Sequence, residues 1–296
     1  MKSVRTATLE IAYEEYGTVG GDPVILLHGF PYDGHAYGEV APLLAADGCR
    51  VLVPWLRGYG ATRFLSPETP RSGEQAALGD DLRQFMDALG IQRAALGGYD
   101  WGGRAACVVA ALWPERVRCL VSSGGYNIFI ISTMNNPASA AQEARNWYQW
   151  YFHTPRGING LDQNRRELIR LIWTMWSPAW KFDDATFERS APSFDNADFV
   201  DVVIQSYRHR YGNAPGDPAL ADIEARLAER PKISVPTINL YGGHDGISPA
   251  LETDNQGGNF TGFYERRLVP DVGHNVPQEA PREFAQAIRD LLAMTK

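Results

Sequence analysis

The sequence predicts an α/β protein with a mostly parallel central sheet, helices on both faces of that sheet, and a helical insertion. Short apolar runs that suit buried strands alternate with amphipathic segments, and glycine-rich turns separate them. One long segment interrupts this alternation and is rich in aromatic residues. A chain of 296 residues, 44% hydrophobic and 21% charged, can bury the large core that such a fold needs.

The first half of the chain supplies most of the expected sheet. Residues 5–16 alternate weakly in polarity and predict an outer antiparallel strand. Val24, Ile25, Leu26 and Leu27 form an apolar run typical of a strand buried on both faces. Further elements are expected at 36–46 (helix), 50–54 (strand), 74–89 (helix), 94–96 (strand), 103–112 (helix) and 118–122 (strand).

The character of the chain changes after Gly124 and Gly125. The following residues are aromatic and helical with no strand-like run, and the alternation resumes after Pro231. Strands are expected at 235–241 and 264–269, and a closing amphipathic helix at 281–294. We therefore expect a core domain formed by residues 1–126 and 216–296. Residues 127–215 should form a helical cap domain over the carboxyl ends of the strands, where such sheets bind ligands.

The sharpest motif lies where the strand at 94–96 meets the helix at 103–112. The residues Gly98-Tyr99-Asp100-Trp101-Gly102 match the nucleophile-elbow pattern G-x-S-x-G with Asp in place of Ser. Such a turn exposes one side chain at a helix N-terminus, where negative charge is stabilised. A carboxylate needs no activation to attack carbon, so Asp100 could form an ester. The plainer interpretation is that Asp100 only caps the helix.

Two further groups follow late strands. Asp245 lies after the strand at 235–241, and His274 lies after the strand at 264–269. The order Asp100, Asp245, His274 is the nucleophile–acid–base order of the α/β-hydrolase fold. His274 would activate a water molecule against the Asp100 ester, and Asp245 would orient His274. Asp245 could instead be a turn residue, and His274 a surface loop histidine.

The loop His28-Gly29-Phe30-Pro31 follows the first core strand. The N–H groups of Phe30 and Trp101 would together form an oxyanion hole for water attack on the ester. Pro31 allows a cis bond that would fix the loop. His28 is expected to be structural rather than catalytic.

These runs resemble the epoxide hydrolase branch of the α/β-hydrolase superfamily, which also contains fluoroacetate and haloalkane dehalogenases. The resemblance covers nearly the whole chain, and an Asp elbow followed directly by Trp is specific to this branch. The resemblance implies two cap tyrosines that donate a proton to the opening epoxide, and Tyr148 and Tyr207 match their motifs. Tyr99 departs from the branch, which often has His at that position. The expected substrate pocket also includes His28, Pro31, Tyr99, Trp147, Trp150 and Tyr151.

A dehalogenase is the alternative within the same branch. Fluoroacetate dehalogenases carry Arg after the nucleophile and a His-Trp pair in the cap, whereas this chain has Trp101 and Gln149-Trp150. Trp101 with Trp147 or Trp150 could still hold a halide, and Arg104 could meet a substrate carboxylate, although it is expected to serve the helix. A binding protein that has lost turnover, and an esterase, are weaker alternatives.

Composition limits the partners. A net charge of −7 argues against nucleic acid as a partner. No apolar run reaches transmembrane length, and the N-terminal residues do not form a signal peptide. Cys49, Cys107 and Cys119 are expected to be reduced and buried, which suits a cytoplasmic protein. No metal-ligand cluster or phosphate-binding loop is present, so we expect no metal and no cofactor. The expected partners are a small apolar epoxide and water, with a homodimer as a further option.

Overall fold

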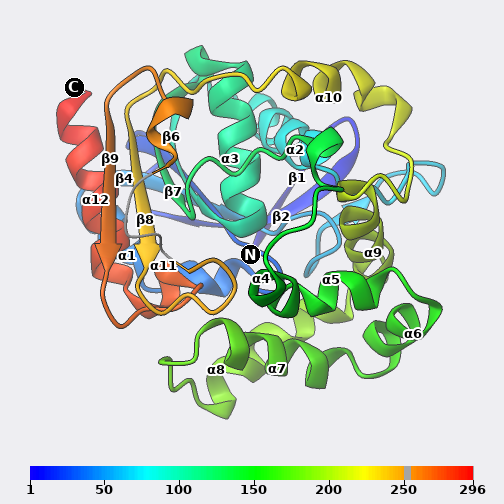
Figure 1. The fold of residues 1–296 in the computed structure, drawn as a ribbon. Coiled ribbons are helices and arrows are strands. Elements are labelled where there is room, and N and C mark those ends of the chain that lie inside the picture. The colour runs from blue at the N-terminus through cyan, green and yellow to red at the C-terminus, as the bar shows by residue number, and fades with distance from the viewer. Residues whose placement is uncertain (250–254, 296) are drawn as a thin grey trace.

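A computed structural model describes residues 1–249 and 255–295. Its centre is one twisted sheet in the order β1-β2-β4-β3-β6-β7-β8-β9, with β5 paired to β2 (Figure 1). β1 and β2 run antiparallel to their neighbours, and the path from β4 to β9 is parallel. The strands are β1 Lys2–Arg5, β2 Leu9–Tyr16, β3 Asp22–Leu27, β4 Cys49–Pro54, β5 Arg63–Phe64, β6 Ala94–Tyr99, β7 Val117–Ser123, β8 Thr237–Gly242 and β9 Tyr264–Val269.

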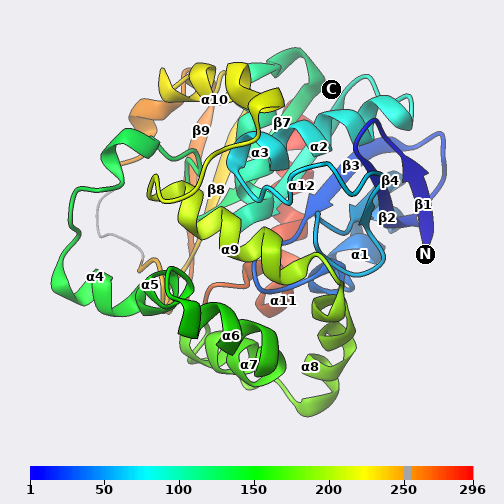
Figure 2. The same cartoon turned by 90° about the vertical axis from the view of Figure 1, so that its right-hand side faces the viewer.

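Helices cover both faces of the sheet, as the alternating sequence predicted. α1 and α12 pack together on one face, and α2, α3 and α10 pack on the other (Figures 1 and 2). α2 and α3 approach closely because Gly79 has no side chain, and a Cβ there would lie 2.2 Å from Val108 Cγ1. The helices are α1 Val40–Ala46, α2 Gln75–Ala88, α3 Asp100–Leu112, α4 Ala140–Arg145, α5 Trp147–Phe152, α6 Pro155–Gln163, α7 Arg165–Trp176, α8 Asp184–Ser190, α9 Phe199–Arg210, α10 Ala221–Ala228, α11 Val276–Glu279 and α12 Pro281–Met294.

The hydrophobic core explains why the central strands read as continuous apolar runs. Val24, Ile25 and Leu26 of β3 have no exposed surface, because helices lie above and below them. On α12, Phe284, Ile288 and Leu291 are spaced along one helical face and are fully buried. Burial of each such side chain contributes about 1.5–3 kcal/mol relative to exposure.

Helices α4 to α9 lie together at the carboxyl ends of the strands, and we call this group of helices the lid. In Figure 1 the arrowheads of β8 and β9 point down, α4 to α8 lie in the lower part of the view, and α9 lies to the right of the sheet. The lid is anchored to the loop after β3: Trp173 Nε1 donates to the Pro31 carbonyl over 2.7 Å, and Ser190 and Ser193 donate to the buried Asp33 carboxylate. The lid therefore rests on the same loop that faces the elbow.

Two local expectations differ from the structure. The expected strand at 5–16 is a hairpin of β1 and β2, because Thr6 Oγ1 accepts from the Leu9 N–H and turns the chain. The expected helix at 36–46 is divided into a 3-10 turn, Gly34–Tyr37, and α1. Asp33 ends the preceding loop by accepting from the His35 N–H as an N-cap. No helix in the described residues is long and apolar enough to cross a membrane.

Candidate active site

Asp100 lies at the junction of β6 and α3 in a strained backbone conformation. Its φ is 49°, a region that non-glycine residues rarely adopt. The turn requires glycine at two positions. A Cβ at Gly98 would lie 2.5 Å from the Gly102 carbonyl oxygen, and a Cβ at Gly102 would lie 2.0 Å from the Leu27 carbonyl oxygen. The two glycines therefore let β6, α3 and the end of β3 meet at Asp100. This is the elbow geometry that the sequence pattern predicted.

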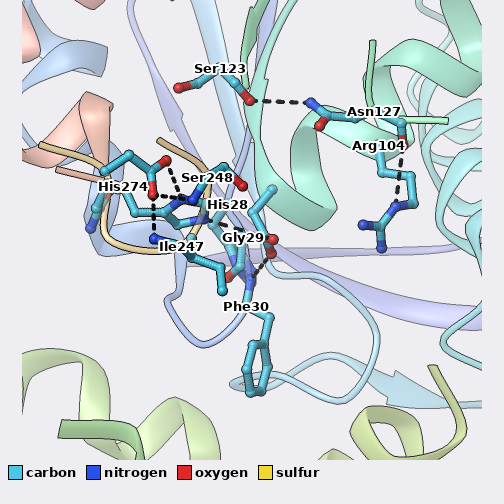
Figure 3. A network of polar contacts seen from close by, with 12 residues as sticks. His28, Gly29, Phe30, Arg104, Ser123, Asn127, Ile247, Ser248 and His274 are labelled. Atoms are coloured by element: carbon cyan, nitrogen blue, oxygen red, sulfur yellow. Dashed lines mark hydrogen bonds and ion pairs between the residues drawn. The ribbon is translucent and has the colours of Figure 1, made fainter. Parts of the chain in front are cut away.

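The loop after β3 supplies a donor to the Asp100 carboxylate. The Phe30 N–H donates to Asp100 Oδ1 over 2.7 Å, a bond drawn as a dashed line beside Phe30 in Figure 3. The bond between Phe30 and Pro31 is cis. Burial would raise the pKa of Asp100, but the charge and proximity of His274, with smaller contributions from Arg104 and the Phe30 N–H, hold that pKa below its usual value. Asp100 is therefore ionised. Trp101 follows it at the start of α3, where first-turn N–H groups have no helical partner.

His274 stands between two carboxylates. Its Nδ1 lies 2.8 Å from Asp245 Oδ2, and its Nε2 lies 3.8 Å from Asp100 Oδ2. Asp245 is itself held by the N–H groups of Ile247 and Ser248, each 2.9 Å from Oδ1. The Nε2 atom is buried and has no hydrogen-bond partner in the described structure. Nε2 therefore faces the Asp100 carboxylate.

The electrostatics of this group depend on the state of Asp100. Burial would lower the pKa of His274, but the charges of Asp245 and Asp100 outweigh it and raise the pKa to about 10. The imidazole is therefore protonated while the Asp100 carboxylate is ionised. Neutralising Asp100 would remove one of the two opposing charges, and the pKa of His274 would fall.

Tyr148 and Tyr207 lie against each other near Asp100, but only Tyr148 lines the cavity described below. Tyr148 is on α5 and Tyr207 on α9; both are buried, and their ring centroids lie 5.3 Å apart, nearly perpendicular. Phe30 lies against both rings. Burial raises the pKa of both phenols. Gln149 Nε2 donates to the Tyr148 hydroxyl oxygen over 2.8 Å, which leaves the Tyr148 hydrogen free for another acceptor.

A cavity of about 210 Å³ opens beside these groups. It is lined by Asp100, Asp245, His274 and Tyr148, and Arg104 and Arg210 also face it. The remaining lining residues are Ser123, Gly124, Asn127, Phe129, Met134, Gln142, Asn146, Gln149, Tyr211, Ile247 and Ser248. Figure 3 shows Arg104 and Asn127 on the α3 side of the site and His274 with Ile247 and Ser248 on the other side. The lining is therefore more polar than the aromatic lid sequence suggested.

Several residues expected in the pocket lie elsewhere. His28 is buried and accepts from the Leu56 N–H at Nε2 over 3.0 Å; burial lowers its pKa to about 4, so it is neutral and structural. Tyr99 packs behind His274, with ring centroids 6.2 Å apart. Pro31 bonds Trp173 through its carbonyl. Three lid aromatics also lie outside the cavity lining: Trp147 and Tyr151 pack against each other, and Trp150 is 38% exposed with its Nε1 donating to Glu143.

Sequence reasoning missed or set aside several residues that shape the site. Arg210 and Gln149 line the cavity, and so does Arg104, for which a place on the helix was favoured over contact with a substrate carboxylate. Ser177, just after α7, accepts from the His274 N–H over 3.1 Å and donates to Glu279 over 2.6 Å. The spacing of Asp100 and Arg104, four residues apart on one helix, was the one sequence signal that could have placed an arginine here.

One group outside the cavity has the composition of a metal site. Glu74, His209 and Glu224 offer ligand atoms within 4.8 Å of one another. Both Glu224 oxygens already accept hydrogen bonds, from the Ala76 N–H and from Gln75 Nε2. Glu224 therefore binds the start of α2 through both oxygens. We do not assign Glu74, His209 and Glu224 as a metal centre.

Comparisons with known proteins agree with the fold. Residues 22–281 match the family model described as alpha/beta hydrolase fold. Epoxide hydrolase A of Mycobacterium tuberculosis is 27% identical over 98% of this chain and 96% of its own length. A crystal structure of a Klebsiella pneumoniae protein, provisionally called an epoxide hydrolase, has 48% identity and a TM-score of 0.96 over 98% of this chain and 96% of that one. Bacillus megaterium epoxide hydrolase, with 17% identity and a TM-score of 0.78 over 99% of this chain and 100% of that one, shares the fold. The chain therefore belongs to the α/β-hydrolase fold family, as an enzyme similar to proteins named epoxide hydrolases.

Proposed function

We propose that this enzyme hydrolyses an epoxide to a vicinal diol through an ester of Asp100. The observation that carries the proposal is the position of His274 Nε2, 3.8 Å from Asp100 Oδ2 and without a partner in the described residues. An Asp nucleophile beside a histidine and a pair of phenols suits a substrate that needs attack at carbon and a proton on the departing oxygen. The names of the similar proteins point to the same substrate class.

In the first step, Asp100 Oδ2 attacks one epoxide carbon and the carbon–oxygen bond on that carbon breaks. Tyr148 or Tyr207 gives its proton to the leaving oxygen, so that a hydroxyalkyl ester forms beside a phenolate. Because Asp100 then has no charge, the pKa of His274 falls from its resting value of about 10. The imidazolium proton returns through solvent to the phenolate, and His274 becomes a base.

In the second step, His274 Nε2 takes a proton from water and the hydroxide attacks the Asp100 carboxyl carbon. The Phe30 N–H, which donates to Oδ1 in the resting enzyme, would stabilise the developing oxyanion. The Trp101 N–H at the start of α3 is proposed as the second donor. The tetrahedral species releases the diol oxygen, which takes the proton of the new carboxyl group. Asp100 is again a carboxylate, and His274 is again an imidazolium.

The proposal is tested by trapping the ester. His274→Gln should retain the first step and lose the second, so mass spectrometry should find a peptide containing Asp100 heavier by the mass of the epoxide. Asp100→Asn is the matched control and should carry no adduct. Normal turnover by His274→Gln, or an adduct on any other residue, would falsify this mechanism.

A dehalogenase reaction is the second candidate, and one observation favours it. The Trp101 indole N–H is buried without an acceptor in the described part of the chain, and a halide could occupy that position. Trp150 does not complete a halide site, because its Nε1 donates to Glu143 near the surface. Release of fluoride or bromide from fluoroacetate or a bromoalkane, without diol formation from any epoxide, would select this reaction instead.

A further inference from the structure

The cavity contains two arginines that the reaction above does not use. Arg104 is only 4% exposed and Arg210 only 7%, and both line the cavity beside Asp100. Arg104 comes from α3, one helical turn after Asp100, and Arg210 is the last residue of α9 in the lid. Core and lid therefore each contribute one guanidinium to the same wall.

Neither guanidinium has a carboxylate partner. Arg104 Nε donates to the Asn127 carbonyl over 3.3 Å, and Arg210 Nη1 donates to Gln149 Oε1 over 3.3 Å. Within residues 1–249 and 255–295 no acidic side chain forms an ion pair with either one, and Arg210 Nη2 is buried without any partner. Burial, followed by the charge of Arg210, lowers the pKa of Arg104 to about 9. Two buried cations near each other are costly unless an anion joins them.

Phe129 holds the two guanidiniums in place. Its ring centroid lies 4.4 Å from the Arg104 Cζ and 4.5 Å from the Arg210 Cζ. Arg210 also lies 4.7 Å from the centroid of the Tyr207 ring. Contacts with aromatic faces fix the guanidiniums while leaving in-plane N–H groups for a ligand. The arrangement is a built donor site next to the nucleophile.

We propose that Arg104 and Arg210 form a subsite for a carboxylate of the substrate, so that the epoxide this enzyme prefers is a small anionic one. This inference rests on the proposed function and names the substrate class of the same site. With His274 protonated, the cavity holds three cationic groups against the carboxylates of Asp100 and Asp245, and a bound carboxylate would balance them. Asp100 and Arg104 are four residues apart on α3, a spacing that puts Cβ atoms about 5–6 Å apart. The carboxylate would therefore be attached to an epoxide carbon or to the carbon next to it.

Arg210 has another conceivable role, since its charge also acts on the phenols of Tyr148 and Tyr207 and favours their ionised forms. A purely electrostatic effect on the tyrosines would lower kcat for charged and neutral epoxides alike. A carboxylate subsite would instead raise KM for the anionic substrate alone. The two roles are therefore separable with a matched pair of substrates.

Binding is tested first with probes that cannot react. Cyclopropanecarboxylate resembles an oxirane carboxylate in shape, and cyclopropanecarboxamide is its neutral counterpart. Calorimetry should show the carboxylate binding to the wild type and binding about tenfold to a hundredfold more weakly to Arg104→Gln and Arg210→Gln. Arg156→Gln, an exposed position on the lid helix α6, is the control and should bind like the wild type. Equal binding of carboxylate and carboxamide by the wild type would overturn the subsite.

Turnover is tested with oxirane-2-carboxylate, its neutral amide, and fluoroacetate. We expect kcat/KM for the carboxylate epoxide to exceed that for the amide, and this preference to shrink at least tenfold in Arg104→Gln and Arg210→Gln. If the cyclopropane carboxylate binds through both arginines but no epoxide is opened, the subsite stands and the proposed function fails. If diol forms equally well from the amide and from the anion, the proposed function stands and the subsite fails. Fluoride release would identify a haloacid as the source of the carboxylate.

Discussion

At the scale of single residues, the site is organised by charge. Asp100 and Asp245 lie on either side of His274, at 3.8 Å and 2.8 Å, and together they keep the imidazole protonated. In the proposed mechanism, His274 must lose this proton before it can activate water. Ester formation would resolve this conflict, because it would remove the charge of Asp100 when a base is needed.

The charge dependence can be measured directly. Asp100→Asn replaces the carboxylate by a neutral group of the same shape, so the pKa of His274 should fall from about 10 by at least one unit. Imidazole ¹⁵N shifts followed by NMR between pH 5 and 11 report this pKa. Asp222→Asn, at an exposed position on α10, should leave the titration unchanged. An unaltered titration in Asp100→Asn would mean that Asp245 alone sets the protonation of His274.

The two phenols should act on the first chemical step only. Tyr148→Phe and Tyr207→Phe each remove one proton donor while the other remains, and we expect ester formation to slow about tenfold to a hundredfold in each. The double variant should lose more than either single variant. Rapid-quench measurement of ester formation separates this step from hydrolysis of the ester. If only hydrolysis slows, the phenols do not protonate the epoxide oxygen.

At the scale of elements, segments distant in sequence are joined through buried polar groups. Glu74, just before α2, accepts from the Asp217 N–H and lies 3.2 Å from His209 Nε2 of α9. Burial raises the pKa of Glu74 to about 7, although the Asp217 N–H and the charge of Arg57 oppose the shift. The start of α2 is thus tied to the lid by a carboxyl group that prefers its neutral form.

The burial of Glu74 makes the free energy of unfolding depend on pH. The pKa of Glu74 is higher in the folded state than the usual 4.5. The stabilising contribution of the protonated Glu74 is therefore fully present below about pH 4.5 and is lost as pH rises through 7. Glu74→Gln keeps a neutral hydrogen-bonding group, so it should stabilise the protein by about 1–2 kcal/mol at pH 8 and change little at pH 4.5. Urea unfolding at both pH values measures the difference, with the exposed Glu115→Gln as control. A stabilisation that is the same at both pH values would exclude the ionisation of Glu74 as its cause.

At the scale of the whole molecule, the sequence predicts what depends on periodicity and turn chemistry. The alternation of strands and helices predicted the parallel sheet. Asp100, Asp245 and His274 were chosen because each follows a strand, and the structure brings the three side chains together. The contacts of the lid could not be predicted from the sequence. The residue pattern of a helix shows which face is apolar, but it does not show which groups the polar side chains contact. Arg210 and Ser177 reach the site only through the packing of α9 and α7 against the sheet. Trp147, Trp150 and Tyr151 were expected in the pocket for their chemistry, and the same packing places them outside the cavity lining.

The lid is bonded directly to the catalytic loops, which has a consequence for unfolding. The Trp176 carbonyl accepts from the Gly246 N–H and the His274 N–H, and Ser177 Oγ joins His274 to Glu279. A lid held by the loops of β8 and β9 cannot loosen without disturbing them. We therefore expect lid and core to unfold together, in one cooperative transition.

Tryptophan fluorescence tests this expectation, because five of the eight tryptophans lie between residues 147 and 180. Its denaturation midpoint should coincide with that of far-UV circular dichroism, which reports on the whole chain. Ser177→Ala removes one donor to the Glu279 carboxylate and one of the two acceptors of the His274 N–H, so it should lower the free energy of unfolding by about 0.5–1.5 kcal/mol and move both midpoints together. Ser234→Ala, at an exposed position in the segment before β8, should leave both midpoints in place. A fluorescence transition at lower denaturant than the dichroism transition would show that the lid opens independently and that the bonds around Ser177 do not couple it to the catalytic loops.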